Sequence, residues 1–315
     1  MDVGFAADVK ESLTSSPKYL KSKYFYDERG DELFKSIMQL DEYYLTRCEF
    51  EIFTSQKEKM LSLFSEDGKR FQLLEFGAGD GSKTKKLLEY FYESKVNFKY
   101  VPIDISKHIL DELTTDLKRS FSELEVEAIN KDYFTALKEL RSVETTSKVI
   151  LFLGSNIGNF IEYRALEFLS LLQENLDVKD KVMIGFDLKK DPEVIYRAYN
   201  DRSGVTRAFN LNLLQRINRE LGGNFDITKF YHFPIYDPIA GQARSFLISK
   251  INQEVNIKAI DLKITFIANE PIHMEISQKY DLEQINSLAT NSGFKVIDNL
   301  FDCRHYFVDS IWQPV

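Results

Sequence analysis

The sequence has few of the features that mark secreted, membrane or metal-binding proteins. Its two cysteines, Cys48 and Cys303, among 315 residues provide neither a disulfide framework nor the cysteine spacing of a metal site. No apolar run approaches the ~18 residues that would cross a membrane. The first ten residues lack the basic-then-apolar order of a signal peptide. We therefore expect a reduced, cytoplasmic protein that does not contact a membrane.

Basic residues are also scarce. The 41 lysines and arginines are outnumbered by 49 aspartates and glutamates, which gives a formal net charge of −8. Binding to a nucleic-acid backbone requires concentrated Lys and Arg, so this balance argues against a nucleic-acid partner. The four histidines have no metal-ligand spacing, and we predict no metal site. The expected protein is a monomer that acts on a small molecule.

Aromatic residues, in contrast, are abundant. The 25 phenylalanines and 16 tyrosines exclude a largely disordered chain, because such chains have few large apolar side chains to bury. The length allows two domains, or one large domain with an insertion.

Residues 71–187 alternate between apolar runs and amphipathic stretches. Such alternation predicts βαβ units and a parallel sheet, and near-continuous apolar runs indicate strands covered on both faces. The predicted strands are Phe71–Phe76, Phe98–Ile103, Val149–Leu153 and Val182–Phe186, with a weaker one at Val126–Ile129, and the predicted helices are 83–93, 106–119 and 161–175.

The segments before and after this region follow a different pattern. Helical periodicity occurs at 31–39 and 47–63. Thr206 is a candidate N-cap for a helix over 207–221, which Gly222 would end. The runs 244–251 and 257–267 are expected to form an antiparallel pair.

The C-terminal segment is expected to return to the parallel sheet. Asp281 and Gln284 have the spacing of a capping box for a helix that Gly293 ends, and strand-like runs follow at 294–300 and 305–312. We therefore predict a Rossmann-like, doubly wound α/β core with a smaller inserted α+β domain. The core comprises 66–190 plus 281–315, and the smaller domain comprises 1–65 plus 191–280.

A glycine-rich loop, Gly77-Ala78-Gly79-Asp80-Gly81-Ser82, follows the first predicted strand and precedes a helix. Ligands of open α/β sheets bind at the carboxyl ends of the strands, and glycines allow them to approach the backbone closely. A dinucleotide fingerprint would require a third glycine where Ser82 stands. Glu75 before the loop is instead typical of S-adenosylmethionine (SAM) methyltransferases.

Two further acidic residues follow successive strands. Asp104 is placed to bind ribose hydroxyls, and Asp132 with Tyr133 could flank an adenine. These positions favour SAM as the ligand, with NAD and a purely structural glycine turn as the alternatives.

Several segments together resemble the histidine-specific methyltransferases of ergothioneine biosynthesis (the EgtD type). They occur in the family's order over nearly the whole chain, which makes the resemblance more specific than the glycine loop alone. The segments are Lys23–Gly30, Glu32–Phe34, Asp41–Arg47, Glu49, Phe152–Asn159, Gly185–Pro192, Ala198–Asp201, Gly204–Thr206 and Glu275–Ser277.

The resemblance implies threefold methylation of the α-amino group of free L-histidine to hercynine, with a SAM-binding core and an inserted substrate domain. It also implies roles for individual residues. The implied SAM-binding residues are Gly77, Gly79, Lys83, Asp104, Asp132 and Tyr133; Tyr26, Tyr43, Asn159 and Tyr199 would surround the amino-acid head group, the first three as catalytic residues; and Glu275 and Ser277 would bind the imidazole ring.

One position departs from the family. Where the family commonly has a methionine beside the imidazole, this sequence has Ser245, which changes the wall of the predicted substrate pocket. Two alternatives therefore stay open. The same chemistry could act on another amino acid or a peptide N-terminus, or the protein could be a SAM or nucleotide sensor without catalysis.

Overall fold

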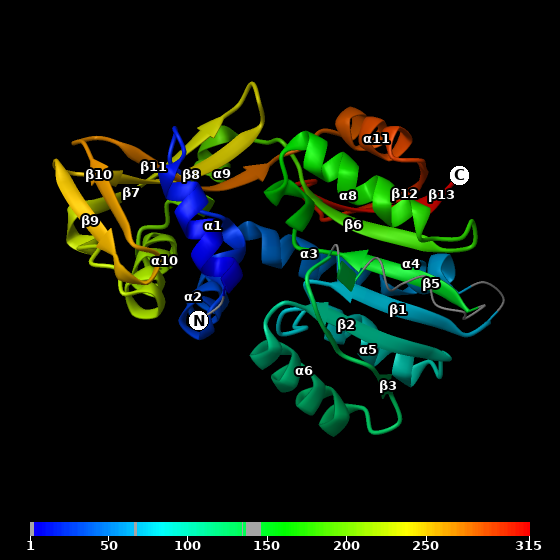
Figure 1. Ribbon diagram of the computed structural model, residues 1–315. Coiled ribbons are helices and arrows are strands. Elements are labelled where there is room, and N and C mark those ends of the chain that lie inside the picture. Colours follow the sequence, from blue (N-terminus) through cyan, green and yellow to red (C-terminus); the bar gives the residue numbers. More distant parts are fainter. Residues whose placement is uncertain (1–2, 66–67, 134, 137–145) are drawn as a thin grey trace. The chain divides into compact units, whose positions relative to one another are not determined.

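The computed structural model describes residues 3–65, 68–133, 135–136 and 146–315. The contacts divide the chain into two compact units. The smaller unit comprises Met1–Tyr44 and Lys190–Ser277, and the larger unit comprises Leu45–Lys189 and Gln278–Val315. The colours of Figure 1 show that each unit combines segments that are distant in the sequence. Within the described ranges, no helix combines the length and apolar character needed to span a bilayer.

The larger unit is built on an eight-stranded sheet with the order β12-β13-β6-β5-β1-β2-β3, and β4 also pairs with β2. Among the described strands of this sheet, β13 alone runs opposite to the direction of the other seven. This topology confirms the predicted doubly wound core. The strands are β1 (Phe71–Phe76), β2 (Phe98–Asp104), β3 (Glu125–Val126), β4 (Ile129–Asn130), β5 (Ser147–Phe152), β6 (Lys181–Asp187), β12 (Phe294–Phe301) and β13 (Phe307–Pro314).

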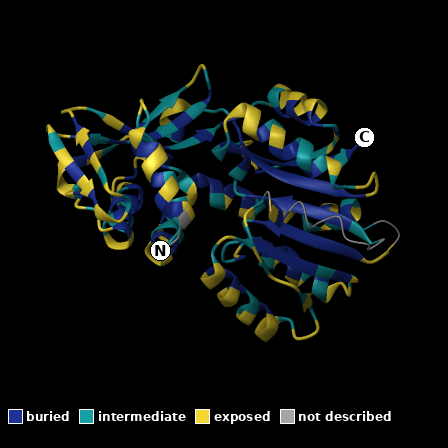
Figure 2. Ribbon diagram, in the orientation of Figure 1, coloured by how far each residue is buried: buried dark blue, intermediate teal, exposed yellow. Residues whose placement is uncertain are grey.

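Helices cover both faces of this sheet, and the central strands are buried (Figure 2). On one face, Leu74 and Phe76 belong to a core cluster with side chains of α8 (Glu162–Glu174) and α11 (Leu282–Asn291). On the other face, Phe71 packs against Phe91 of α5 (Thr84–Glu93), with ring centroids 6.0 Å apart. Burial on both faces explains why these strands are recognisable as continuous apolar runs. The unit also contains α6 (Lys107–Ser120) and the short helix η2 (Asn156–Asn159).

The predicted boundary between the two parts is wrong for residues 45–65. These residues form most of α3 (Tyr44–Ser55) and all of α4 (Lys57–Phe64), and they belong to the larger unit. The reason is packing, because the fully buried Phe64 lies 6.5 Å from the ring of Phe91. The single helix expected over 47–63 is interrupted at Gln56, whose backbone is not helical.

The C-terminal predictions are confirmed. The Asp281 side chain accepts a hydrogen bond from the Gln284 N–H, and the Gln284 side chain accepts one from the Asp281 N–H, so the capping box is complete. Gly293 follows α11 with a φ of +81°, a value that favours glycine. The weak strand expected at Val126–Ile129 is instead two short strands, β3 and β4.

The smaller unit combines helices with two small sheets. One sheet has the order β11-β8-β7, and β9 pairs with β10 in the other. Its core joins α1, α2 and α10 to these strands. The elements are α1 (Val3–Thr14), η1 (Ser22–Phe25), α2 (Glu28–Met38), α9 (Pro192–Tyr199), α10 (Val205–Leu221), η3 (Ile227–Lys229), β7 (Phe230–Asp237), β8 (Gln242–Ser249), β9 (Gln253–Ile257), η4 (Lys258–Ile260), β10 (Leu262–Phe266) and β11 (Pro271–Gln278).

Two local predictions for this unit are wrong. The run 244–251 does not pair with 257–267, because β8 pairs with β7, and 257–267 is divided by a turn at Asp261 with a φ of +46°. Thr206 does not cap α10. The Asp201 carboxylate accepts the N–H groups of Val205 and Thr206 at 2.9 and 2.8 Å instead. Gly222 does end that helix, with a φ of +64°.

Candidate active site

The strand order of the larger unit creates a switch point between β1 and β5. From β1 the chain continues to β2 on one side, whereas from β5 it continues to β6 on the other. Open α/β sheets bind ligands outside the carboxyl ends of the strands at such a point. The predicted glycine loop follows β1 there, and the segment Gly154–Asn159 follows β5.

The glycine loop leaves its backbone open on one side. Gly77 and Gly79 both have positive φ angles, +72° and +54°. An added Cβ at Gly77 would lie 2.6 Å from the Tyr133 hydroxyl and 3.1 Å from Asn156 Nδ2. An added Cβ at Gly79 would meet no atom within 4 Å. Gly77 thus allows Tyr133 to approach the loop closely, and at Gly79 the backbone is open to a ligand, which fits SAM.

Asp104 ends β2 and faces the glycine loop. Its carboxylate accepts hydrogen bonds from the N–H groups of Gly79, at 3.0 Å, and Ser106, at 2.9 Å. Burial raises the pKa of Asp104, although these backbone hydrogen bonds oppose the shift. Each carboxylate oxygen can accept a second hydrogen bond, so the group remains able to bind a pair of ribose hydroxyls.

Tyr133 is fixed by the core next to the loop. Its ring packs edge-on against Phe76 and Phe152, with centroids 5.8 and 5.2 Å away. Burial raises the pKa of Tyr133, with a smaller contribution from Asp104. Asp132 is exposed, and its carboxylate accepts the Thr135 N–H at 3.0 Å. The structure therefore places Tyr133, Gly77 and Asp104 around one loop, as their positions after successive strands predict.

Glu75 supports the loop from inside the protein. Its carboxylate accepts hydrogen bonds from the hydroxyls of Thr84, at 2.6 Å, and Tyr100. Burial raises the pKa of Glu75 to about 7, despite these hydrogen bonds. Glu75 thus joins the end of β1 to the start of α5 and fixes the direction in which the loop leaves the sheet.

Lys83 precedes α5 and forms an ion pair with Glu49 of α3, in which the glutamate is buried and the lysine is 17% exposed. Glu49 also accepts the Gly154 N–H at 2.7 Å. Burial alone would lower the pKa of Lys83, but Glu49 and the nearby Glu75 raise it. The lysine is therefore held as a cation at the switch point. No role was predicted for Glu49 itself, although it is one of the family-like segments.

Tyr26 and Tyr43 of the smaller unit both pack against Phe34. Tyr26 packs edge-on against Phe34, at 5.6 Å between centroids, and Phe209, at 5.8 Å. Tyr43 contacts the same Phe34 at 6.4 Å. Both tyrosines are half-buried. The two predicted catalytic tyrosines thus share one aromatic cluster, in which the roles of Phe34 and Phe209 were not predicted.

A second group of predicted residues meets at α9 and β11. The hydroxyl of Tyr199, the last residue of α9, donates a hydrogen bond of 2.8 Å to Ser277 Oγ. Glu275 lies two residues before Ser277 on β11 and is half-buried. Ser245 on the neighbouring β8 is 1% exposed, and its Oγ has no hydrogen-bond partner among the described residues. The structure thus joins a predicted head-group residue to a predicted ring-binding residue.

Asn159 is the one predicted substrate residue in the larger unit. It is the last residue of η2 in the larger unit and is half-buried. The remaining predicted substrate residues belong to the smaller unit. The roles of all these residues remain predictions.

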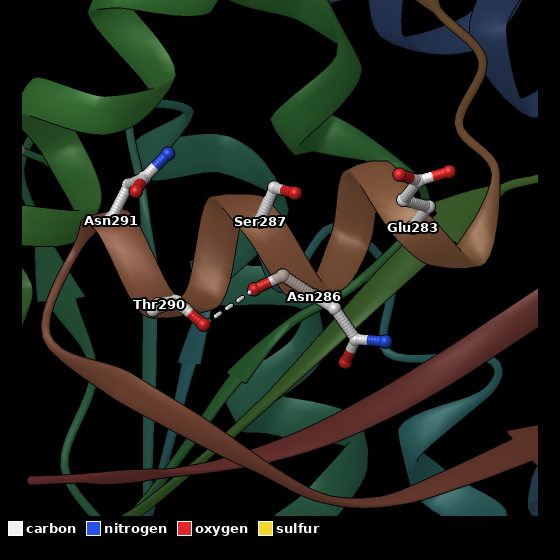
Figure 3. Close-up of a pocket in the computed structure, with 5 residues that line it drawn as sticks. All are labelled: Glu283, Asn286, Ser287, Thr290 and Asn291. Atoms are coloured by element: carbon white, nitrogen blue, oxygen red, sulfur yellow. Dashed lines mark hydrogen bonds between the residues drawn. The ribbon is translucent and has the colours of Figure 1, made fainter.

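Two other features, an acidic cluster with a cysteine and a surface hollow, lie outside the predicted site. Glu51, Asp302 and Cys303 place possible metal ligands near one another, but Asp302 already accepts the N–H groups of Tyr306 and Phe307, both at 2.7 Å. A surface hollow on α11 contains none of the predicted site residues, and Figure 3 shows its lining. The exposed lining residues are Glu283, Asn286, Ser287, Thr290 and Asn291.

The sheet topology, with one antiparallel strand, and the open glycine loop with Asp104 define the class of SAM-dependent methyltransferases. The chain belongs to the family of histidine-specific, SAM-dependent methyltransferases, whose model matches residues 5–314. It is therefore an enzyme that uses SAM as its methyl donor. This membership confirms the resemblance that the sequence motifs indicate.

Individual relatives agree with this family. The histidine N-alpha-methyltransferase of Mycolicibacterium smegmatis is 32% identical over 288 residues, covering 91% of this chain and 88% of the relative. That of Mycobacterium tuberculosis is 33% identical over 286 residues, covering 91% and 87%. The solved structure of the mitomycin 7-O-methyltransferase is similar in fold alone, with a TM-score of 0.51, 10% identity and coverage of 93% of this chain and 59% of that one.

Asp104→Ala is expected to weaken SAM binding by about 1–3 kcal/mol, because hydrogen bonds to the ribose would be lost. Isothermal titration calorimetry with SAM measures this change. Asp111→Ala is the matched control, since Asp111 is exposed on α6 and forms an ion pair with the exposed Lys107. An unchanged Kd in Asp104→Ala would contradict the ribose role.

Proposed function

We propose that this chain transfers three methyl groups from SAM to the α-amino nitrogen of L-histidine and so forms hercynine. Membership of the histidine-specific family supports the substrate, and so do the names of the two mycobacterial relatives. Within the structure, the strongest support is the hydrogen bond between Tyr199 and Ser277. This bond joins Tyr199, proposed for the amino-acid head group, to Ser277, proposed for the imidazole ring. Glu275 lies two positions before Ser277 on the same strand.

In this proposal the larger unit binds the cofactor. Gly77 and Gly79 supply backbone without side chains, Asp104 accepts the ribose hydroxyls, and Asp132 and Tyr133 flank the adenine. Lys83 pairs with the carboxylate of the methionine portion, which is the only anionic group of SAM. When bound, SAM supplies a methyl group on a positively charged sulfur.

The other proposed residues hold the substrate amine in line with that methyl group. Such positioning can contribute up to ~7–11 kcal/mol to a rate enhancement. Tyr26, Tyr43 and Asn159 offer hydrogen bonds without a full negative charge, so they do not trap the amine in its protonated form. A model α-amino group has a pKa of ~7.7–8.0, and that of a free amino acid is higher, so the neutral amine is a minor but reachable form near neutral pH and no strong base is required.

The product of the third transfer carries a permanent positive charge. Tyrosine faces attract such a cation. The shared cluster of Tyr26 and Tyr43 is therefore suited to a substrate that changes from an amine to a quaternary ammonium. Glu275 can accept an imidazole N–H, and a site built to bind that group rejects amino acids without it.

Mass spectrometry tests this proposal directly. Purified protein is mixed with SAM carrying a deuterated methyl group and with each of the twenty amino acids in turn, and Asp104→Ala serves as the cofactor-binding control. Addition of three labelled methyl groups to histidine alone, on the α-nitrogen by fragmentation, is the expected result. Methylation of another amino acid would contradict histidine as the substrate, and SAM binding without any methylation would favour a sensor.

Ser245→Ala is expected to raise the KM for histidine about five- to tenfold while leaving or raising the thermal stability. A buried hydroxyl without a partner is unfavourable, and a bound substrate would supply the missing hydrogen bond. Steady-state kinetics and thermal unfolding measure the two effects. Ser249→Ala on the same strand is the control, because Ser249 Oγ already donates to the Ile251 carbonyl at 2.8 Å. An unchanged KM in Ser245→Ala would exclude this contact.

The predictions of a monomeric, cytoplasmic enzyme without a metal or a nucleic-acid partner form part of the same proposal. Light scattering of the purified protein tests whether it is a monomer. Activity after exhaustive chelation tests the absence of a metal requirement.

A further inference from the structure

Asp309 on β13 is a buried acid that the reaction described above does not use. Its side chain is completely buried, and neither carboxyl oxygen accepts a hydrogen bond from a donor among the described residues. Leaving such a group unpaired in the interior is costly, and a native protein retains one for a reason. The surroundings of Asp309 indicate what that reason is.

Glu49 occupies the space beside Asp309. Asp309 pairs directly with Gly185 of β6, and side chains of directly paired residues project on the same face of a sheet. An added Cβ at Gly185 would lie 2.6 Å from Glu49 Oε1, so the Glu49 carboxylate fills the place of a Gly185 side chain. The carboxyl groups of Glu49 and Asp309 therefore lie side by side in the interior.

If Glu49 and Asp309 were both ionised, their two negative charges would exceed the single positive charge of Lys83. Lys83 is the cation paired with Glu49, and Glu75 also faces Lys83 from β1. Burial raises the pKa of Asp309 well above its usual range, the Glu49 carboxylate raises it further, and Lys83 opposes the shift. The buried position beside the Glu49 carboxylate thus favours a neutral Asp309, and the O–H of a neutral Asp309 could donate a hydrogen bond to Glu49.

Lys83 connects this acid pair to the cofactor loop. It directly follows Ser82 of the loop, and its Nζ would lie 3.5 Å from a Cβ added at Gly154, which follows β5. The same Glu49 carboxylate accepts the Gly154 N–H. Glu49 therefore fixes both sides of the switch point, and any displacement of its carboxylate would move the Lys83 ammonium.

We propose that Asp309 is a positioning residue of the cofactor site: as a neutral acid it donates a hydrogen bond to Glu49, and Glu49 in turn holds Lys83 for the carboxylate of SAM. This inference rests on the proposed role of Lys83 in cofactor binding. An ionised Asp309 would place a second negative charge beside Glu49 and weaken the attraction of the site for an anionic group.

Two substitutions test whether Asp309 acts as a neutral hydrogen-bond donor or as a negative charge. Asp309→Asn keeps a donor of the same shape, and its Kd for SAM should stay within about threefold of the wild-type value. Asp309→Leu keeps the volume and removes the donor, and its Kd should rise by about tenfold or more. The KM for histidine, measured with saturating SAM, should change less than about twofold in both.

Infrared difference spectroscopy supplies a second measurement, which includes the wild-type protein. The spectrum of wild type minus Asp309→Asn should contain the carbonyl band of a protonated carboxylic acid, and this band should shift when SAM is added. These two proteins are sufficient for the test if Asp309→Leu does not fold. Ser310→Ala on the same strand is the control, because Ser310 Oγ accepts the Trp312 indole N–H at 2.7 Å and should affect only stability.

Three results would overturn the inference. One is a loss of SAM affinity in Asp309→Asn as large as in Asp309→Leu, which would mean that a charge is required. Another is unchanged SAM affinity in Asp309→Leu with lowered stability, which would indicate a purely structural role. The third is the absence of the acid band. If wild-type protein itself failed to bind SAM, the cofactor assignment would fail instead.

Discussion

Glu275→Ala is expected to raise the KM for histidine by about 10- to 100-fold and to leave the Kd for SAM nearly unchanged. A hydrogen bond to a charged group contributes ~1.5–3 kcal/mol, and each 1.4 kcal/mol corresponds to about tenfold. Glu275 belongs to the smaller unit, whereas every predicted cofactor residue belongs to the larger one. Steady-state kinetics with varied histidine, together with calorimetry of SAM binding, measures the two constants separately.

Glu270→Ala is the matched control for this substitution. Glu270 precedes β11 in the same unit, forms an ion pair with Lys18 and accepts the Ile267 N–H at 2.9 Å. It should change stability slightly and leave the KM for histidine unaltered. Glu275→Gln should recover part of the loss, because its amide oxygen can still accept the imidazole N–H. An equal fall in SAM affinity in Glu275→Ala would contradict a role restricted to the substrate ring.

The parts of the fold that the sequence predicts are those with a strong local signal. Strands β1, β2, β5 and β6 are buried on both faces and are visible as apolar runs. The helix at Leu282–Asn291 has a complete capping box. In both cases neighbouring residues alone specify the structure, and the predicted boundaries differ by at most two residues from the observed ones.

The parts that the sequence does not predict depend on contacts between distant residues. Strand β7 contains Pro234, which is unfavourable in a strand interior, and no local pattern identifies it as the partner of β8. Residues 45–65 have the amphipathic pattern of any surface helix. Their place in the larger unit follows from contacts such as that between Phe64 and Phe91.

The same distinction applies to the candidate site. Gly77, Asp104 and Tyr133 follow successive parallel strands, so their proximity could be predicted from the topology. The pairing of Lys83 with Glu49 spans 34 residues and has no periodic signal. Asp309 has the pattern of an ordinary polar strand residue, and only its pairing with Gly185 places it beside Glu49.

Lys279→Met is expected to lower the free energy of unfolding by about 3–5 kcal/mol, the largest stability effect that we predict. Lys279 Nζ lies 2.7 Å from Asp187 Oδ2, and both side chains are 0% exposed. Removing the lysine leaves a buried carboxylate without its cation at the end of β6, where the Asp187 N–H also donates to Ser155 Oγ at 3.1 Å. Denaturant unfolding followed by the fluorescence of the single tryptophan, Trp312, reports on this unit.

Two variants test whether the uncompensated charge is the cause. Lys189→Met removes a neighbouring lysine whose partner Asp281 is 46% exposed, and it should cost less than about 1 kcal/mol because solvent screens the pair. Asp187→Asn combined with Lys279→Met should recover a large part of the lost stability, since no buried charge then remains unpaired. If the double variant were as unstable as Lys279→Met alone, the loss would come from packing of the lysine stem rather than from the charge of Asp187.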